Sequence, residues 1–201
     1  HKYGLLRVLG DAGRLRLAVC WMLTASDGRT DGSKTGYLAQ EKRFRAHDPE
    51  LFDHLKHVMK PGAARHVQAI ERSPILRNAR YFSDIVPDSA EGRREFFRYV
   101  RSATADCDRV FFDPDNGLEV KSRPYGAKDS SKHLFLEEVA DFAKSKASTL
   151  VYQHFPREER SAYMARRARQ LHELTGRRIS SFKTGNVVFF LLQPAGQSCH
   201  L

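Results

Sequence analysis

The chain has 201 residues, of which 41% are hydrophobic and 29% charged, and its formal net charge is +10. This composition excludes a disordered chain, and no apolar run approaches the roughly 20 residues that a membrane-spanning helix needs. We therefore expect a single cytoplasmic domain over residues 1–201 with no membrane partner. The strong positive charge favours a polyanionic partner, with nucleic acid as the leading candidate.

The first 84 residues alternate between helix and strand patterns. An apolar run over 15–23 predicts a buried strand, whereas the Gly, Asp, Ser and Thr residues of 25–36 predict a loop. Asp48-Pro49-Glu50 predicts a helix start, because it combines a capping side chain, a first-turn proline and an acid. The other elements expected here are a helix over 2–12, a short helix over 66–72 and a strand over 80–84.

The rest of the chain continues this alternation and sets the expected fold class. Helices are predicted over 91–103, 133–145 and 158–175, the last one ended by Gly176, and strands over 109–113, 148–155, 179–183 and 186–192. Alternating helices and apolar strands predict an α/β domain with a mainly parallel sheet and helices on both faces. The last two strands predict an antiparallel hairpin at one edge. This layout is similar to the Rossmann-like fold of S-adenosylmethionine-dependent methyltransferases.

One segment, Arg109-Val-Phe-Phe-Asp-Pro-Asp-Asn-Gly-Leu-Glu-Val-Lys-Ser122, is the most informative of the chain. Its apolar part predicts a buried strand that ends abruptly in Asp113, Pro114, Asp115 and Asn116. Open α/β sheets bind their ligands at the carboxyl ends of their strands. The segment therefore predicts a functional site at its tip, although Pro-Asp-Asn-Gly is also good turn chemistry.

The chain resembles a family of uncharacterised bacterial proteins along nearly its whole length. The resemblance rests on the motifs KYGLLR, WMLT, Asp31-Gly32, FDPDNGLEVKS, Ser131-Lys132 and YQHFPR. It implies no particular activity.

A weaker resemblance is to one-domain bacterial enzymes that methylate adenine N6 in large-subunit ribosomal RNA. His1-Lys2-Tyr3-Gly4-Leu5-Leu6 is similar to their first helix, and Asp113-Pro114 matches the start of their catalytic Asp-Pro-Pro-Tyr motif. Asn116 and Gly117 depart from that motif, where an aromatic residue would stack on the flipped base. We expect Phe155 or Tyr125 to supply this stacking surface instead.

The resemblance implies a site for S-adenosylmethionine and for an amine substrate. Asp113 and the carbonyl of Pro114 would orient the amine, and Asp115, Asn116 and His154 would shape the pocket. The cofactor-binding residues would be Thr24, Asp27, Gly28 and Asp84.

Basic residues supply candidate phosphate contacts around this tip. The guanidinium of Arg157, just past the strand over 148–155, suits phosphate recognition. The other candidates are Lys121, Lys132 and Arg160.

Two other functions use the same residues. Asp108 followed by Glu119-Val-Lys121 is typical of a nuclease core, in which Asp108, Asp113 and Glu119 would hold Mg²⁺ and Lys121 would steady the attacking water. That alternative requires the chain to turn back as a hairpin after residue 113. A third hypothesis is a non-catalytic nucleic-acid-binding module on a decayed enzyme fold.

Overall fold

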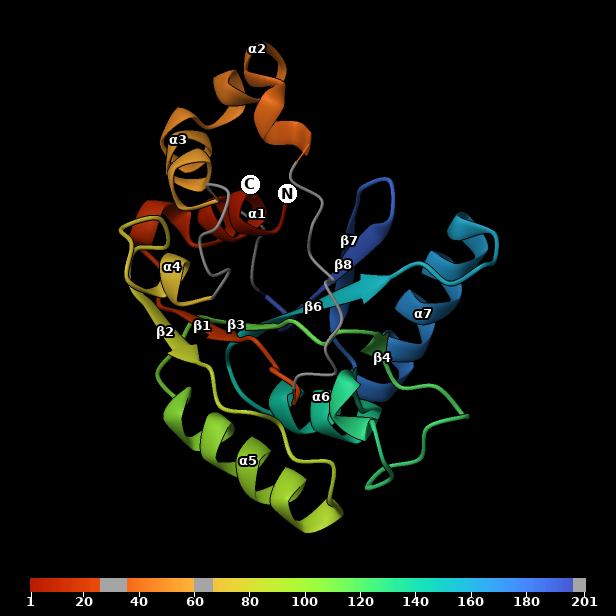
Figure 1. Cartoon of the computed structure of the whole chain (residues 1–201). Helices are drawn as coiled ribbons and strands as arrows, with labels where there is room; N and C mark the ends of the chain where they lie inside the picture. Colours follow the sequence, from red (N-terminus) through yellow and green to blue (C-terminus); the bar gives the residue numbers. More distant parts are fainter. Residues whose placement is uncertain (26–35, 60–66, 197–201) are drawn as a thin grey trace. The chain divides into compact units, whose positions relative to one another are not determined.

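The computed structural model describes residues 1–25, 36–59 and 67–196. The chain divides into two compact units. Figure 1 shows its helices and strands, coloured by their position in the sequence. The helical unit comprises His1–Arg14 with Ala25–Asn78, and the sheet unit comprises Leu15–Thr24 with Ala79–Leu201. None of the helices in the described ranges combines the length and the apolar character that crossing a membrane requires.

The helical unit contains short helices, as the sequence predicts for 2–12, for the region after Asp48 and for 66–72. Helix α3 begins where expected, because the Asp48 side chain accepts a hydrogen bond from the Leu51 N–H (3.1 Å) and Pro49 occupies the first turn. Arg7 holds this start in place through Asp48 (2.8 Å) and Glu50 (2.6 Å). The elements of this unit are α1 (Lys2–Leu9), η1 (Asp11–Gly13), η2 (Gly36–Ala39), α2 (Glu41–Phe44), η3 (Arg45–His47), α3 (Pro49–Val58) and α4 (Gln68–Glu71).

The sheet unit is built on a six-stranded sheet with the order β2-β1-β3-β6-β8-β7. The first four strands of that order are parallel, and β8 runs antiparallel to both of its neighbours. A second, two-stranded parallel sheet joins β4 to β5. The strands are β1 (Leu17–Cys20), β2 (Ala79–Phe82), β3 (Arg109–Phe112), β4 (Gly117–Leu118), β5 (His133–Leu134), β6 (Ser148–His154), β7 (Arg178–Lys183) and β8 (Val187–Gln193).

Three helices, α5 (Ala90–Ala103), α6 (Leu136–Ala143) and α7 (Arg160–Thr175), cover one face of the six-stranded sheet. The core on this face joins Phe97 of α5 and Phe142 of α6 to Phe112 of β3. Leu171 of α7 packs into the same core, and a 3₁₀ turn, η4 (Ser130–Lys132), precedes β5. Because side chains alternate across a strand, the residues next to these core positions belong to the opposite face.

The predicted α/β class and mostly parallel sheet are confirmed. The final hairpin lies at one edge of the sheet, as predicted, with β7 outermost and β8 between β7 and β6. The reason is composition: β8 is almost entirely apolar and buried, whereas β7 carries Arg178 and Lys183 and stays partly exposed. The predicted helix over 133–145 begins only at Leu136, because His133 and Leu134 pair with Gly117 and Leu118.

Candidate functional site

The polar tip predicted after β3 forms a tight turn at the carboxyl edge of the parallel strands. The Asp113 N–H donates to the Cys20 carbonyl of β1 (3.0 Å), which extends the pairing of β3 with β1 to this residue. The Gly117 N–H then donates to the Pro114 carbonyl (3.3 Å), which closes a turn over Pro114–Gly117. Asp115 and Asn116 at the apex are exposed.

The register of the sheet places aromatic residues on both sides of Asp113. Phe112 pairs with Cys20 of β1 and with Val151 of β6, so the next position puts Asp113 between Trp21 and Tyr152. Asp113 follows the core residue Phe112 and therefore belongs to the opposite face of the sheet. Trp21 is buried and stacks on Tyr81 of β2, with ring centroids 6.1 Å apart.

Thr24, which follows β1, is brought to the apex of the turn. Its hydroxyl donates to the Asp115 carboxylate (2.9 Å), so two residues 91 positions apart meet at this edge. The Asn116 N–H donates to the Lys132 carbonyl (2.9 Å), which fixes the other side of the turn. The structure thus brings Thr24, Asp115 and Asn116 together at this edge of the sheet.

Gly117 is the position that allows the chain to leave the turn. Its φ is +88°, a conformation that side chains disfavour, and a Cβ there would lie 2.5 Å from the Gln153 side chain. Gln153 uses this close approach to accept a hydrogen bond from the Leu118 N–H (2.7 Å). It also donates to the carbonyls of Asn116 (3.4 Å) and His154 (2.7 Å). Gln153 therefore fastens the turn to β6.

His154 ends β6 at the same edge and is exposed. Its Nε2 lies 3.2 Å from the Tyr152 hydroxyl, and the two rings meet edge to face. Tyr152 and His154 are two residues apart on β6, so their side chains lie on the same face of the sheet. This is the face to which Asp113 belongs. Phe155, a predicted stacking residue, instead packs toward the core against Tyr163, with ring centroids 6.1 Å apart.

The predicted cofactor residues are only partly described. Asp84 follows β2 and is exposed, which places its carboxylate at the carboxyl end of the strand next to β1. Thr24 is described above, whereas Asp27 and Gly28 lie outside the described residues. Cys20, directly behind the turn, is fully buried, and this burial raises the pKa of its thiol to about 12. Cys20 is therefore a packing residue rather than a nucleophile.

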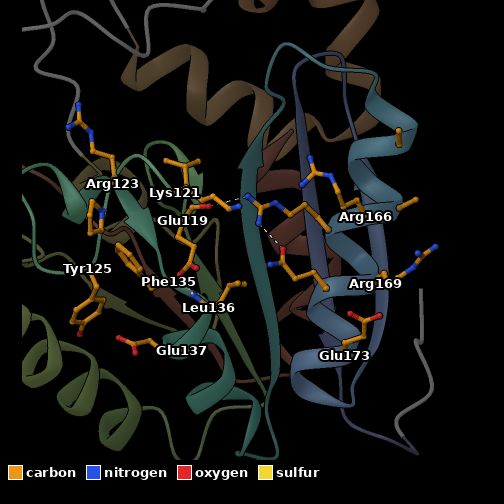
Figure 2. A pocket seen from close by; sticks show the side chains of 16 residues that line it. Glu119, Lys121, Arg123, Tyr125, Phe135, Leu136, Glu137, Arg166, Arg169 and Glu173 are labelled. Atoms are coloured by element: carbon orange, nitrogen blue, oxygen red, sulfur yellow. Dashed lines mark hydrogen bonds between the residues drawn. The ribbon is translucent and has the colours of Figure 1, made fainter.

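The predicted phosphate residues fall into two places. Arg157 and Arg160 follow β6 and are exposed, with the Arg160 guanidinium over the Phe155 ring. Lys132 lies behind the turn, 3.5 Å from Asp129. Lys121 lies away from the turn, in a groove beside α7 that Figure 2 shows.

The residues of the nuclease alternative do not assemble. The hairpin that it requires is absent from the described segment after β3, because β6 and not β4 pairs with β3. Asp108 lies at the amino end of β3, roughly 16 Å along the strand from Asp113, and accepts from the Arg16 N–H (2.7 Å). The Glu119 carboxylate instead accepts from the Leu136 N–H (2.8 Å) at the start of α6. Within the described ranges no group of three or more His, Cys, Asp or Glu side chains is placed to hold a metal ion.

A buried ion pair supports the segment that follows the turn. Arg93 of α5 is 0% exposed and makes two hydrogen bonds to the Glu138 carboxylate (2.7 and 2.9 Å). Two further N–H groups of Arg93 donate to the carbonyls of Ser130 (3.0 Å) and His133 (2.6 Å). Burial raises the pKa of Glu138 to about 7, against the opposing effect of Arg93. This pair fixes the backbone around residues 130–138 that in turn contacts Asn116 and Gly117.

Asp88 provides a second anchor for the same segment. Its carboxylate accepts from the backbone N–H groups of Asp129 (2.9 Å) and Ser131 (2.8 Å). Partial burial acts to raise the pKa of Asp88, but the hydrogen bonds from Ser131 and Asp129 outweigh it, and the pKa lies below the ordinary value.

No family model, curated protein or solved structure matches the chain. The two family resemblances therefore stay predictions. Trp21, Tyr152 and Arg93 belong to this region but are not among the site residues that the sequence predicts. Trp21 and Tyr152 carry a signal in retrospect, since each lies at the carboxyl end of a predicted strand.

Proposed function

We propose that the protein modifies an exocyclic amino group of a nucleic-acid base by transferring a methyl group from S-adenosylmethionine. The observation that carries this proposal is the position of Asp113-Pro114 at the carboxyl end of β3. There Asp113 shares its register with Trp21 and Tyr152, and the Asp115 carboxylate is held by Thr24.

The sheet supports the proposal by analogy. Four parallel strands are followed by β8, which runs antiparallel between β6 and β7, and this order resembles the layout of the methyltransferase-like Rossmann sheet. In such a sheet the ligand site lies at the carboxyl ends of the parallel strands, where Asp113, Thr24 and Asp84 are found. The analogy supports the location of the site, and the chemistry must come from the side chains.

The acceptors at the tip suit an amine substrate. An exocyclic amine of a base is a poor nucleophile, because its lone pair is delocalised into the ring. The Asp113 carboxylate can accept one of its N–H groups, and the Pro114 carbonyl, which already accepts from Gly117, retains a second lone pair for the other. Both acceptors would orient the lone pair outward, and Asp113 is placed to take up the proton that is released.

The base must leave its stack to reach these acceptors, at a cost of a few kcal/mol. Of the two aromatic neighbours of Asp113 in the sheet register, Trp21 is buried, so the partly exposed Tyr152 ring provides the aromatic surface for the extruded base. Tyr152 therefore takes the role that the sequence alone assigns to Phe155 or Tyr125.

The cofactor residues fit S-adenosylmethionine in part. An acidic residue beyond the strand next to β1 is where nucleotide-binding sheets hold ribose hydroxyls, and Asp84 occupies this place. The bound cofactor would supply the methyl group. Asp84 would hold the ribose, and Thr24 would keep Asp115 away from the substrate acceptors.

Two measurements test the proposal. Titration calorimetry should detect binding of S-adenosylmethionine or its demethylated product, and tritiated methyl transfer to RNA or DNA should follow. The variant Asp113→Asn should lower transfer by about 10²–10⁴-fold, the usual contribution of a positioned acid–base group. Asp141→Asn, which neutralises an exposed carboxylate on α6, is the matched control.

The proposal is wrong if neither cofactor form binds at millimolar concentration, or if both variants transfer methyl groups equally well. Nucleic-acid binding without transfer would favour the non-catalytic module instead. Plasmid cleavage that requires Mg²⁺ and is lost in Lys121→Ala would favour the nuclease, for which the arrangement of Asp108 and Glu119 offers no support.

A further inference from the structure

A groove of about 1090 Å³ lies in the sheet unit, away from the Asp113 turn. One wall is the segment over 119–125 with the start of α6, and the other is the exposed face of α7 (Figure 2). The proposed function uses none of the groove's side chains.

Cations gather at one end of this groove. Figure 2 shows Arg123, Lys121 and Arg166 at the upper end of the view, on opposite walls. Lys121 and Arg123 are exposed, and neither forms an ion pair or a side-chain hydrogen bond with any part of the chain that the structure describes. Arg166 contacts Glu158 (2.7 Å) at the surface. Lys121 and Arg123 therefore keep their capacity for an external anion, whereas Arg166 shares its charge with Glu158.

The carboxylates of the groove do not neutralise this end. Glu119 points its carboxylate at the Leu136 N–H (2.8 Å), where it caps α6. Glu137 and Glu173 lie at the lower end of the view in Figure 2. The groove therefore has a cationic end and an acidic end, and a polyanion is attracted to the first and repelled by the second.

The two walls are tied together without a ligand. Arg167 of α7 donates to the Glu119 carbonyl (3.1 Å) and to the Gln170 side chain (2.7 Å). Tyr125, on the groove wall, is held edge to face against Phe135, with ring centroids 5.0 Å apart. A groove whose walls are already fixed loses little conformational freedom on binding. Tyr125 also gives the groove wall an aromatic surface, which lies below Arg123 and beside Glu137 in Figure 2.

We propose that this groove binds the sugar-phosphate backbone of a single-stranded nucleic acid. Cations combined with an accessible aromatic ring are the features that bind single strands without reading sequence. The choice of nucleic acid over an acidic polypeptide rests on the proposed function and on the net charge of +10. Five residues separate the end of β6 from the start of α7, so the first turns of α7, which carry Arg166, lie toward the edge that holds His154. A strand bound at the cationic end thus leads toward the Asp113 turn.

Fluorescence anisotropy with a labelled 20-nucleotide poly(U) or poly(dT), measured over a series of KCl concentrations, tests this inference. The double variant Lys121→Ala/Arg123→Ala should reduce the slope of log K against log[KCl] by about 1.4, since each phosphate contact on a single strand contributes about 0.7. At 0.2 M KCl this corresponds to roughly tenfold weaker binding. The matched control is Arg178→Ala/Lys183→Ala, which also removes two positive charges, but from the edge strand β7.

Three outcomes would overturn the inference: equal losses in the two double variants, no change of slope in Lys121→Ala/Arg123→Ala, or displacement of the oligonucleotide by polyglutamate at equal charge concentration. The last outcome would assign the groove to an acidic polypeptide. Methyl transfer by the wild-type protein, assayed beside the binding titrations, separates the two proposals. If no variant or wild-type protein transfers methyl groups but the groove variant still loses affinity, the groove assignment stands and the proposed function fails.

Discussion

The Asp113 turn and the Arg93–Glu138 pair are both polar clusters of the sheet unit, but they differ in how their hydrogen bonds are used. Around Arg93, each guanidinium nitrogen and both Glu138 oxygens have partners inside the protein. At the turn, Asp115 and Asn116 are exposed and the Pro114 carbonyl accepts one weak bond. A saturated buried cluster fixes a backbone, whereas an exposed and partly satisfied one keeps acceptors available for a ligand.

The largest expected effect separates these two roles directly. Arg93→Met should lower the free energy of unfolding by about 3–5 kcal/mol, because it leaves the buried Glu138 carboxylate without its partner. Urea denaturation measures this loss. Arg94→Met, at the exposed neighbouring position of α5, should change the free energy by less than about 0.5 kcal/mol. Equal midpoints for the two variants would show that the buried pair does not hold the fold.

The next effect concerns the turn itself. Gly117→Ala should cost about 1–3 kcal/mol from its backbone conformation alone, and the contact with Gln153 adds to this cost. Gly185→Ala is the control, since a Cβ there meets nothing within 4 Å. Thermal denaturation of both variants measures the difference. Wild-type stability in Gly117→Ala would mean that the turn is loose rather than fastened to β6.

The smallest effect is a pH dependence of the Asp88 anchor. The pKa of Asp88 is lower in the folded chain than its ordinary value of 3.8, so its stabilising contribution is complete well above pH 3.8 and is lost as pH falls through the folded pKa. Denaturation series from pH 7 to pH 3 should therefore show a shallower acid-side loss in Asp88→Asn than in wild type. Parallel curves would remove Asp88 as an anchor of the segment over 129–131.

Local signals predicted much of the fold. Asp48-Pro49 fixed the start of α3, and Gly176 ends α7 in the left-handed conformation, with φ of +65°. These features depend on a few neighbouring residues, so the sequence alone contains them. The parallel pairing of β3 with β6 likewise follows from two apolar strands separated by a helix.

Long-range pairing explains what the sequence did not predict. His133 and Leu134 have a helical pattern with the residues that follow them, but backbone bonds to the segment after the turn draw them into β5. Arg93 lies in a strongly charged helix, where an arginine without a nearby partner in the sequence is expected to face solvent. Only the fold brings Glu138 to it. To predict that Trp21 and Tyr152 lie beside Asp113, the register of β1, β3 and β6 must be known.

The close approach of Gly117 to Gln153 limits which residues can occupy these two positions during evolution. A side chain at position 117 would overlap an amide that already accepts from the Leu118 N–H, so neither residue can change freely while the other is kept. Among chains that descend from a common ancestor with this one, the two positions should vary together. A larger residue at the first should accompany a shorter one at the second, although 35 other residues separate them along the chain.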